Sequence, residues 1–157
     1  MTELWTSVVG ANFYEVSTEG RVRSVDRVVA TSHGQQSRRR GKVLRGTVAS
    51  NGYPMVTIAY DDGTRRYRTV HTLVAEAFIG PRPTGAQVCH QDGDPLNARV
   101  TNLRYDTPAG NYSDAVAHGT QPATAPQDKC RRGHPLVGEN LYISRRSSGR
   151  EIRQCRR

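Results

Sequence analysis

Residues 87–111 decide the fold, and they read QVCHQDGDPLNARVTNLRYDTPAGN. A short apolar run ends at His90, and an Asp-Gly pair and an Asp-Pro pair follow it, as is typical of a turn. Residues 100–105 can return as a second strand. The stretch therefore predicts a β-hairpin.

A helix is expected directly after this hairpin. Thr107 followed by Pro108 is typical of an N-cap and a first helical residue. We expect the helix to run from Pro108 to about His118, with Asn111 near its start. Strand, loop, strand and helix would then bring His90 and Asn111 together across the hairpin.

This arrangement suits the cleavage of a phosphodiester bond. Such cleavage needs a base that activates water and a cation that stabilises the phosphate and the departing 3′ oxygen. A histidine on a rigid strand can be the base, and an oxygen ligand on a facing helix can hold a hard cation such as Mg²⁺. Loop residues can position the histidine. The pattern His90, Asn102 and Asn111 supplies these parts.

The residues before the hairpin predict a strand, a turn and a short helix. Residues 55–60 alternate as a strand, and Asp61-Asp62-Gly63 is a strong turn signal. Residues 70–78 carry apolar side chains on one helical face, and Gly80-Pro81 ends that helix. The sequence therefore predicts a packed helix ahead of the hairpin.

The first part of the chain predicts a small β module. Residues 20–25 alternate like a half-buried strand after a glycine turn. Residues 27–41 contain Gly34 and the run Arg38-Arg39-Arg40, and we interpret them as a basic loop.

The central run resembles the ββα-metal motif of HNH endonucleases. The residues from Cys89 to Tyr105, followed by Asn111, are similar to this motif in the branch found in phage and intron homing endonucleases. Residues 70–78, VHTLVAEAF, are similar to the helix that precedes the motif in that branch.

The resemblance extends towards the N-terminus. Trp5, residues 14–17 and residues 20–24 are similar to the nuclease-associated modular motif found at the front of such enzymes. Together these segments cover most of residues 1–118.

The resemblance implies a role for each motif residue. His90 would be the general base, Asn102 would fix the loop and orient His90, and Asn111 would be a metal ligand. The other metal ligand would be residue 89, where this branch usually has Asp or Asn but this chain has Cys89. A thiolate matches Mg²⁺ poorly and suits Zn²⁺ or other transition ions, so Mg²⁺, Mn²⁺ and Zn²⁺ all stay open as the catalytic ion.

The end of the chain contains a second candidate metal site. Cys130, His134 and Cys155 offer three ligands, and structural zinc needs four. The order of residues resembles a small zinc-binding module appended to some phage HNH enzymes, in which a further cysteine completes the last pair. The fourth ligand would be Cys89 or water, or it would be absent. The alternative interpretation is that these residues form an unfolded basic tail.

Composition points to a polyanionic partner. The chain has 157 residues and a formal net charge of +9, and nearly all of its basic residues are arginines. Residues 129–157 hold nine basic and two acidic residues, a formal charge of +7. Arginine suits bidentate contacts with phosphate and base edges, so we expect double-stranded DNA as the partner. The expected DNA contacts are Arg38, Arg39, Arg40, Arg131, Arg132, Arg145 and Arg146.

Other classes are disfavoured. No run approaches the ~18 apolar residues of a membrane span. Three cysteines, an odd number, argue against a disulfide framework, so an intracellular protein is expected, in the host cytoplasm if the gene belongs to a phage. A homodimer is left open.

These observations predict an α+β protein in four parts. We expect an N-terminal β module at 1–45, an HNH nuclease core at 46–119 with its ββα-metal motif at about 86–118, a linker at 120–128 and a zinc-ribbon-like basic tail at 129–157. The expected function is metal-dependent DNA endonuclease activity of the HNH homing type. The alternative is a catalytically impaired DNA-binding protein with the same fold, acting as a regulator or packaging accessory.

Overall fold

A computed structural model describes residues 2–121, 130, 132, 134, 135, 138–145 and 151–156, with side chains undescribed at 151–153. The chain forms two compact units, residues 1–120 and residues 121–157, and each is described by itself. Strands dominate and helices are short, which confirms the predicted α+β class.

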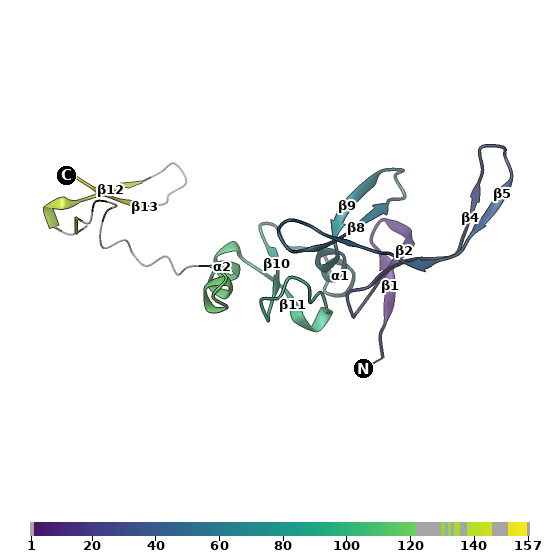
Figure 1. The fold of residues 1–157 in the computed structure, drawn as a ribbon, viewed down its shortest axis with the longest axis horizontal. Coiled ribbons are helices and arrows are strands. Elements are labelled where there is room, and N and C mark those ends of the chain that lie inside the picture. The colour runs from purple at the N-terminus through teal and green to yellow at the C-terminus, as the bar shows by residue number, and fades with distance from the viewer. Residues whose placement is uncertain are drawn as a thin grey trace. The chain divides into compact units, whose positions relative to one another are not determined.

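A four-stranded antiparallel sheet opens the first unit (Figure 1). Its strands are β1 (Trp5–Val8), β2 (Ala11–Ser17), β3 (Val22–Ser24) and β6 (Lys42–Val43), in the order β1-β2-β3-β6. The alternation seen in residues 20–25 corresponds to β3, because Val22 and Ser24 are buried while Arg23 is half-buried.

The basic loop predicted at 27–41 is instead a two-stranded ribbon. Strand β4 (Arg27–Ala30) pairs antiparallel with β5 (Gln36–Arg39), and the ribbon projects away from the rest of the unit in Figure 1. The loop prediction was wrong because the ribbon buries no residue, so its sequence lacks the apolar alternation that marks a packed strand.

A second antiparallel sheet leads into the first helix. It consists of β7 (Thr47–Val48), β8 (Pro54–Ala59) and β9 (Arg65–Thr69), in that order. Helix α1 (Val70–Phe78) follows β9 directly. Its buried face is the one that the apolar spacing predicted, with Leu73 and Val74 almost fully covered.

The hairpin and second helix follow in the predicted order. Strand β10 (Gln87–His90) pairs antiparallel with β11 (Leu103–Asp106), and α2 (Pro108–Ala117) comes after them. The Thr107 hydroxyl accepts a hydrogen bond from the Gly110 N–H at 3.1 Å, which confirms the predicted N-cap.

Two details of this hairpin differ from or add to the expectation. Residues Val100–Asn102 form a short 3₁₀ helix, η1, rather than the start of the return strand. The turn after β10 needs a glycine at 93, since its φ is +75° and an added Cβ would lie 2.7 Å from Nδ1 of His118.

One hydrophobic core joins the segments of the first unit. It includes Val16 from β2, Ile58 from β8, Leu73 from α1 and Leu103 from β11. The residues predicted as an N-terminal module and those predicted as a nuclease core therefore bury their apolar side chains together.

The second unit contains a hairpin. Strand β12 (Leu141–Arg145) pairs with β13 (Glu151–Cys155), and a 3₁₀ turn, η2 (Gly138–Asn140), precedes them. None of its described side chains is buried. Across the described part of the whole chain, no helix combines the length and the apolar character needed to cross a bilayer.

Candidate functional site

His90 ends strand β10 and is almost fully buried. Its ring lies against two others: the His71 ring, with centroids 5.0 Å apart and planes at 77°, and the Tyr53 ring, with centroids 5.7 Å apart. The Nε2 atom of His90 is buried and has no hydrogen-bond partner among the described residues. Burial lowers the pKa of His90 below its usual value, while the charges of Asp92 and Asp94 partly oppose this.

Asn102 fixes the loop that follows His90. Its amide Nδ2 donates to Asp92 Oδ1 at 2.8 Å and to the Asn97 carbonyl at 2.9 Å, and its Oδ1 accepts from the Asp92 N–H at 3.1 Å. The Asn102 carbonyl also accepts from the Gln91 N–H at 2.8 Å. These bonds hold the backbone on both sides of the turn, directly after the histidine.

The Asp92 carboxylate is held in its charged form within this loop. The Asp94 N–H at 2.9 Å and the side-chain amides of Asn102 and Asn97 lower its pKa to about 2. The negative charge next to His90 is therefore permanent at neutral pH.

Cys89 and His90 lie on opposite faces of the β10–β11 hairpin. Cys89 is paired in register with Arg104, and His90 is paired with Leu103. Leu103 belongs to the hydrophobic core that packs against α1. His90, its cross-strand partner, therefore lies on the face of the hairpin that is turned towards α1. The Cys89 face lies towards α2, since Arg104 forms ion pairs with Asp106 and with Asp114 of α2.

Asn111 lies on the α2 side of the hairpin. Its Nδ2 donates to Oε1 of Gln87 at 2.7 Å, which ties the start of α2 to β10. The described contacts do not join Asn111 to the His90 ring, whose neighbours are His71 and Tyr53. The two side chains therefore make no direct contact among the described residues, and their convergence on a shared ion stays a prediction.

The donor atoms near Asn111 fit a hard cation only in part. The Asn111 amide oxygen is a suitable ligand for Mg²⁺. Cys89 is 1% exposed, and burial raises the pKa of its thiol, which keeps it neutral at physiological pH. A neutral thiol does not fit Mg²⁺, so residue 89 cannot supply the hard ligand that Asp or Asn would.

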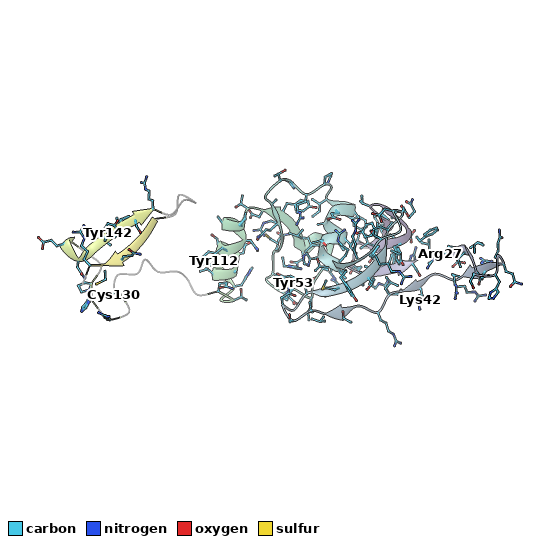
Figure 2. All side chains as sticks on the ribbon, turned by 90° about the horizontal axis from the view of Figure 1, so that it is seen from above. Arg27, Lys42, Tyr53, Tyr112, Cys130 and Tyr142 are labelled. Carbon is cyan, nitrogen blue, oxygen red and sulfur yellow. The ribbon has the colours of Figure 1, made fainter. Side chains whose placement is uncertain are left out.

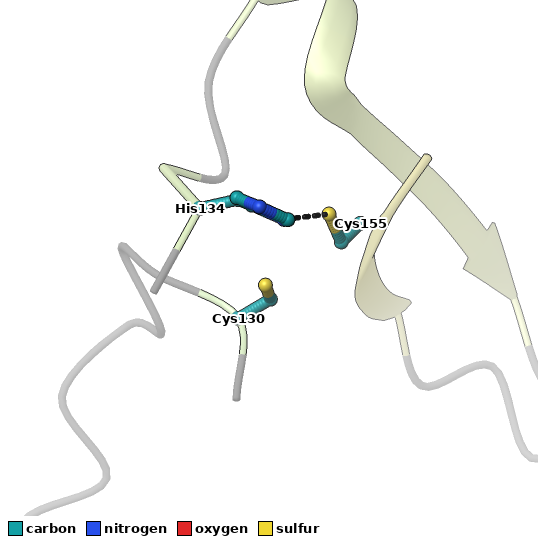
Figure 3. A group of neighbouring side chains, drawn as sticks. All are labelled: Cys130, His134 and Cys155. Atoms are coloured by element: carbon teal, nitrogen blue, oxygen red, sulfur yellow. Dashed lines mark hydrogen bonds between the residues drawn. The ribbon is translucent and has the colours of Figure 1, made fainter. Parts of the chain in front are cut away.

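Three side chains of the second unit converge as metal ligands (Figure 3). The ligand atoms of Cys130, His134 and Cys155 all lie within 4.8 Å of one another, and Cys155 Sγ is 3.6 Å from His134 Nδ1. Desolvation raises the pKa of the Cys130 thiol. Hydrogen bonds from the backbone N–H groups of residues 132 and 134 outweigh this effect and bring the pKa below its usual value. Two thiols and one imidazole form a donor set that fits Zn²⁺.

The predicted DNA-contacting arginines divide into three groups. Arg38, Arg39 and Arg40 are exposed at the end of the ribbon, and Arg38 pairs with Asp26 at 3.1 Å. Arg132 and Arg145 are exposed in the second unit. Arg131 and Arg146 lie outside the described residues.

Sequence reasoning did not assign His71 and Tyr53 to the site. His71 lies on α1, and burial, with a contribution from His90, lowers its pKa to about 4. Tyr53 precedes β8, and its ring centroid is 4.7 Å from that of His71. Both residues are distant from His90 in the sequence. Only the pattern of apolar residues around them could have indicated that their side chains point into the protein.

Comparisons with known proteins find two motifs in this chain and similar endonucleases. The family described as HNH endonuclease matches residues 68–112, and the NUMOD4 motif matches residues 3–59. DNA endonuclease I-HmuI of Bacillus phage SP01 is 27% identical over 136 residues, covering 85% of this chain and 70% of that protein. A protein of the SPbeta prophage of Bacillus subtilis (strain 168), named as the HNH homing endonuclease YosQ, is 37% identical over 84 residues, which is 53% of this chain and 48% of that protein.

A solved structure has the same architecture. The structure of I-HmuI, from work on DNA binding and cleavage by that HNH homing endonuclease, matches with a TM-score of 0.60 and 25% identity. The match covers 97% of this chain and 78% of that one. Together with the two motif matches, this likeness shows an HNH endonuclease domain at residues 68–112, preceded by a NUMOD4 motif at residues 3–59, in a chain that is similar to the homing endonuclease I-HmuI.

Proposed function

We propose that the chain is a metal-dependent DNA endonuclease that hydrolyses phosphodiester bonds with His90 as the general base. The observation that carries this proposal is the position of His90, at the end of β10 and beside the loop held by Asn102, within the segment that matches the HNH endonuclease family. The likeness to I-HmuI, a named DNA endonuclease, supports double-stranded DNA as the substrate.

The attacking water would lose its proton to Nδ1 of His90. Because Nε2 is buried, Nδ1 is the ring nitrogen that can meet a water molecule. The lowered pKa keeps the ring neutral near pH 7, and a neutral ring can accept a proton. Asn102 would act indirectly, by holding the backbone of the loop that follows His90.

Asn111 would supply the protein's oxygen ligand to the catalytic divalent ion. When bound, such an ion neutralises charge on the phosphate and on the departing 3′ oxygen. Mg²⁺ commonly keeps several waters and binds through few protein ligands together with substrate phosphates, so one amide ligand is compatible with a weak site that DNA completes.

A plasmid assay tests the proposed function. Supercoiled DNA is incubated with the full chain and Mg²⁺, Mn²⁺ or Zn²⁺ in turn, and with excess chelator. We expect nicked or linear product with at least one ion and none with chelator. Intact plasmid under all ion conditions, together with measurable DNA binding, would favour the second candidate function, a DNA-binding protein without cleavage. The buried neutral thiol at residue 89 is the observation in favour of that candidate.

Replacing Cys89 by aspartate should raise Mg²⁺-dependent cleavage by ~10-fold, the scale of effect seen when groups around a metal are altered. The carboxylate restores a hard oxygen ligand, and its cross-strand neighbour Arg104 compensates the buried charge. Cys89→Ser is the matched control, since it changes the thiol without adding a charge. Equal Mg²⁺-dependent rates for wild type and Cys89→Asp, with the wild type fully active, would show that residue 89 is not limiting.

The ribbon formed by β4 and β5 is our proposed DNA contact in the first unit. Arg27 and Arg39 lie directly opposite each other in register, and like charges in this position repel unless an anion lies between them. Two-stranded ribbons can enter a DNA groove, and the exposed strands here carry no core contacts that would prevent it. Figure 2 shows Arg27 at the base of this ribbon.

Replacing Arg27 and Arg39 together by glutamine should weaken DNA binding and make it less salt-dependent. Each lost phosphate contact lowers the slope of log affinity against log salt by about 0.9. Arg66→Gln is the control, since Asp62 already pairs with Arg66 at 2.7 Å. Binding isotherms at several salt concentrations measure the slope, and an unchanged slope in the double variant would exclude the ribbon as a phosphate contact.

We also propose that Cys130, His134 and Cys155 bind one structural Zn²⁺, which makes residues 129–157 a separate zinc module. Three converging ligands in a unit with no buried described side chain support this assignment. Small modules without a hydrophobic core depend on such a metal for their fold.

A further inference from the structure

Three rings from three separate segments meet beside the proposed base. Tyr53 comes from the residues between β7 and β8, His71 from α1, and His90 from β10. Each pair of centroids is within ring-contact distance: 4.7 Å for Tyr53 and His71, 5.0 Å for His71 and His90, and 5.7 Å for Tyr53 and His90. Tyr53 lies within the NUMOD4 match and the two histidines within the HNH match, so both motifs contribute to the cluster.

No hydrogen bond fixes the His90 ring among the described residues. A catalytic histidine is usually oriented by a hydrogen bond to the ring nitrogen that does not act on the substrate. Here that nitrogen, Nε2, is buried without a partner. The side chain of Asn102 does not reach the ring, because its bonds go to Asp92 and Asn97.

An interaction other than a hydrogen bond must therefore fix the orientation of the His90 imidazole ring. The terminal torsion of a histidine side chain is broad and only weakly restricted by its own bonds. Two neighbouring rings restrict it from two directions: the His71 plane is at 77° to the His90 plane, and the Tyr53 plane is at 32°. A buried ring enclosed in this way cannot turn without displacing its neighbours.

We propose that His71 and Tyr53 are positioning residues that hold the His90 ring in its reactive orientation through ring packing. This inference rests on the proposed function, in which His90 is the general base. Neither residue is proposed to touch DNA or the reacting atoms.

The chemistry of the two residues allows a clean test. Burial holds the pKa of His71 at about 4, so its ring is uncharged at neutral pH and phenylalanine replaces it without a change of charge. Phenylalanine at position 53 likewise keeps the ring and removes only the hydroxyl. Leucine at either position keeps an apolar side chain and removes the ring.

Steady-state nicking kinetics of the full-length chain compare four variants: His71→Phe, His71→Leu, Tyr53→Phe and Tyr53→Leu. We expect each leucine variant to lower kcat by ~10- to 100-fold with KM changed by less than about threefold, since small displacements of a catalytic group have effects of this size. Each phenylalanine variant should keep kcat within about threefold of wild type. Tyr67→Leu is the control, because Tyr67 is 75% exposed on β9 and lies outside the cluster.

A double-variant comparison separates positioning from general destabilisation. In the His90→Ala background there is no base to orient, so adding Tyr53→Leu or His71→Leu should not lower the residual rate further. A merely structural role would lower both rates by the same factor.

The outcomes are distinct. If His71→Leu does not fold, the comparison of Tyr53→Leu with Tyr53→Phe still tests the positioning role, since Tyr53 is only half-buried and lies outside the helices. Equal kcat for leucine and phenylalanine variants, with His90→Ala inactive, overturns the positioning role and leaves the proposed function intact. A change in KM alone also overturns it, because the residues would then act in DNA binding. A fully active His90→Ala overturns the proposed function, and the positioning role falls with it.

Discussion

Replacing His90 by alanine should lower the rate of metal-dependent DNA cleavage by ~10²- to 10⁴-fold, the usual contribution of a positioned general base. DNA affinity should be unchanged, because the ring is almost fully buried and the proposed phosphate contacts lie on the ribbon. Tyr67→Ala is the control, since Tyr67 is 75% exposed and belongs to β9 rather than to the β10–β11 hairpin or α2. Single-turnover nicking and a binding titration measure the two quantities separately.

The same histidine should set the acidic limb of the pH–rate profile. The His90 pKa lies below its usual 6.5 because burial disfavours the charged ring. The cleavage rate should therefore stay level through neutral pH and fall only as the pH drops below the lowered pKa of His90, where its ring becomes protonated. A limb centred above pH 7, or a His90→Ala variant that keeps wild-type activity, would contradict the assignment of His90 as the base.

Removal of zinc should unfold the second unit and leave the first unit folded. Apparent binding free energies of structural Zn²⁺ are about 10–16 kcal/mol at pH 7. That exceeds what this unit can gain from burial, because its described large apolar side chains Tyr142 and Ile143 are 47% and 50% exposed. Amide hydrogen exchange should show loss of protection in residues 138–145 and 151–156 on chelation, with the first unit unchanged.

Variants of the ligands should have the same effect as chelation. Cys130→Ser and Cys155→Ser should each abolish the bound zinc found by elemental analysis. Cys89→Ser is the control, since it removes a buried cysteine that belongs to the first unit and not to the second. Purified protein that contains no zinc, or a second unit whose exchange protection survives chelation, would exclude the zinc module.

The local elements were predictable where one short stretch contains the whole signal. The helix at Val70–Phe78 follows from apolar spacing on one face, and the start of α2 follows from the Thr107-Pro108 pair. The ribbon at 27–39 was missed, since an exposed ribbon has no buried face to leave a pattern in the sequence.

The sequence by itself determined the order strand, loop, strand and helix, because spacing along one short segment specifies a hairpin and the helix after it. Its motif residues also carried the resemblance to HNH endonucleases. Only the tertiary structure decided that Cys89 is buried and that Asn111 contacts Gln87. The grouping of Tyr53 and His71 around His90 also depends on the tertiary structure, since three distant segments meet there through the packing of one shared core. Side-chain orientation follows from strand register and long-range packing, and neither is encoded within any single stretch of the chain.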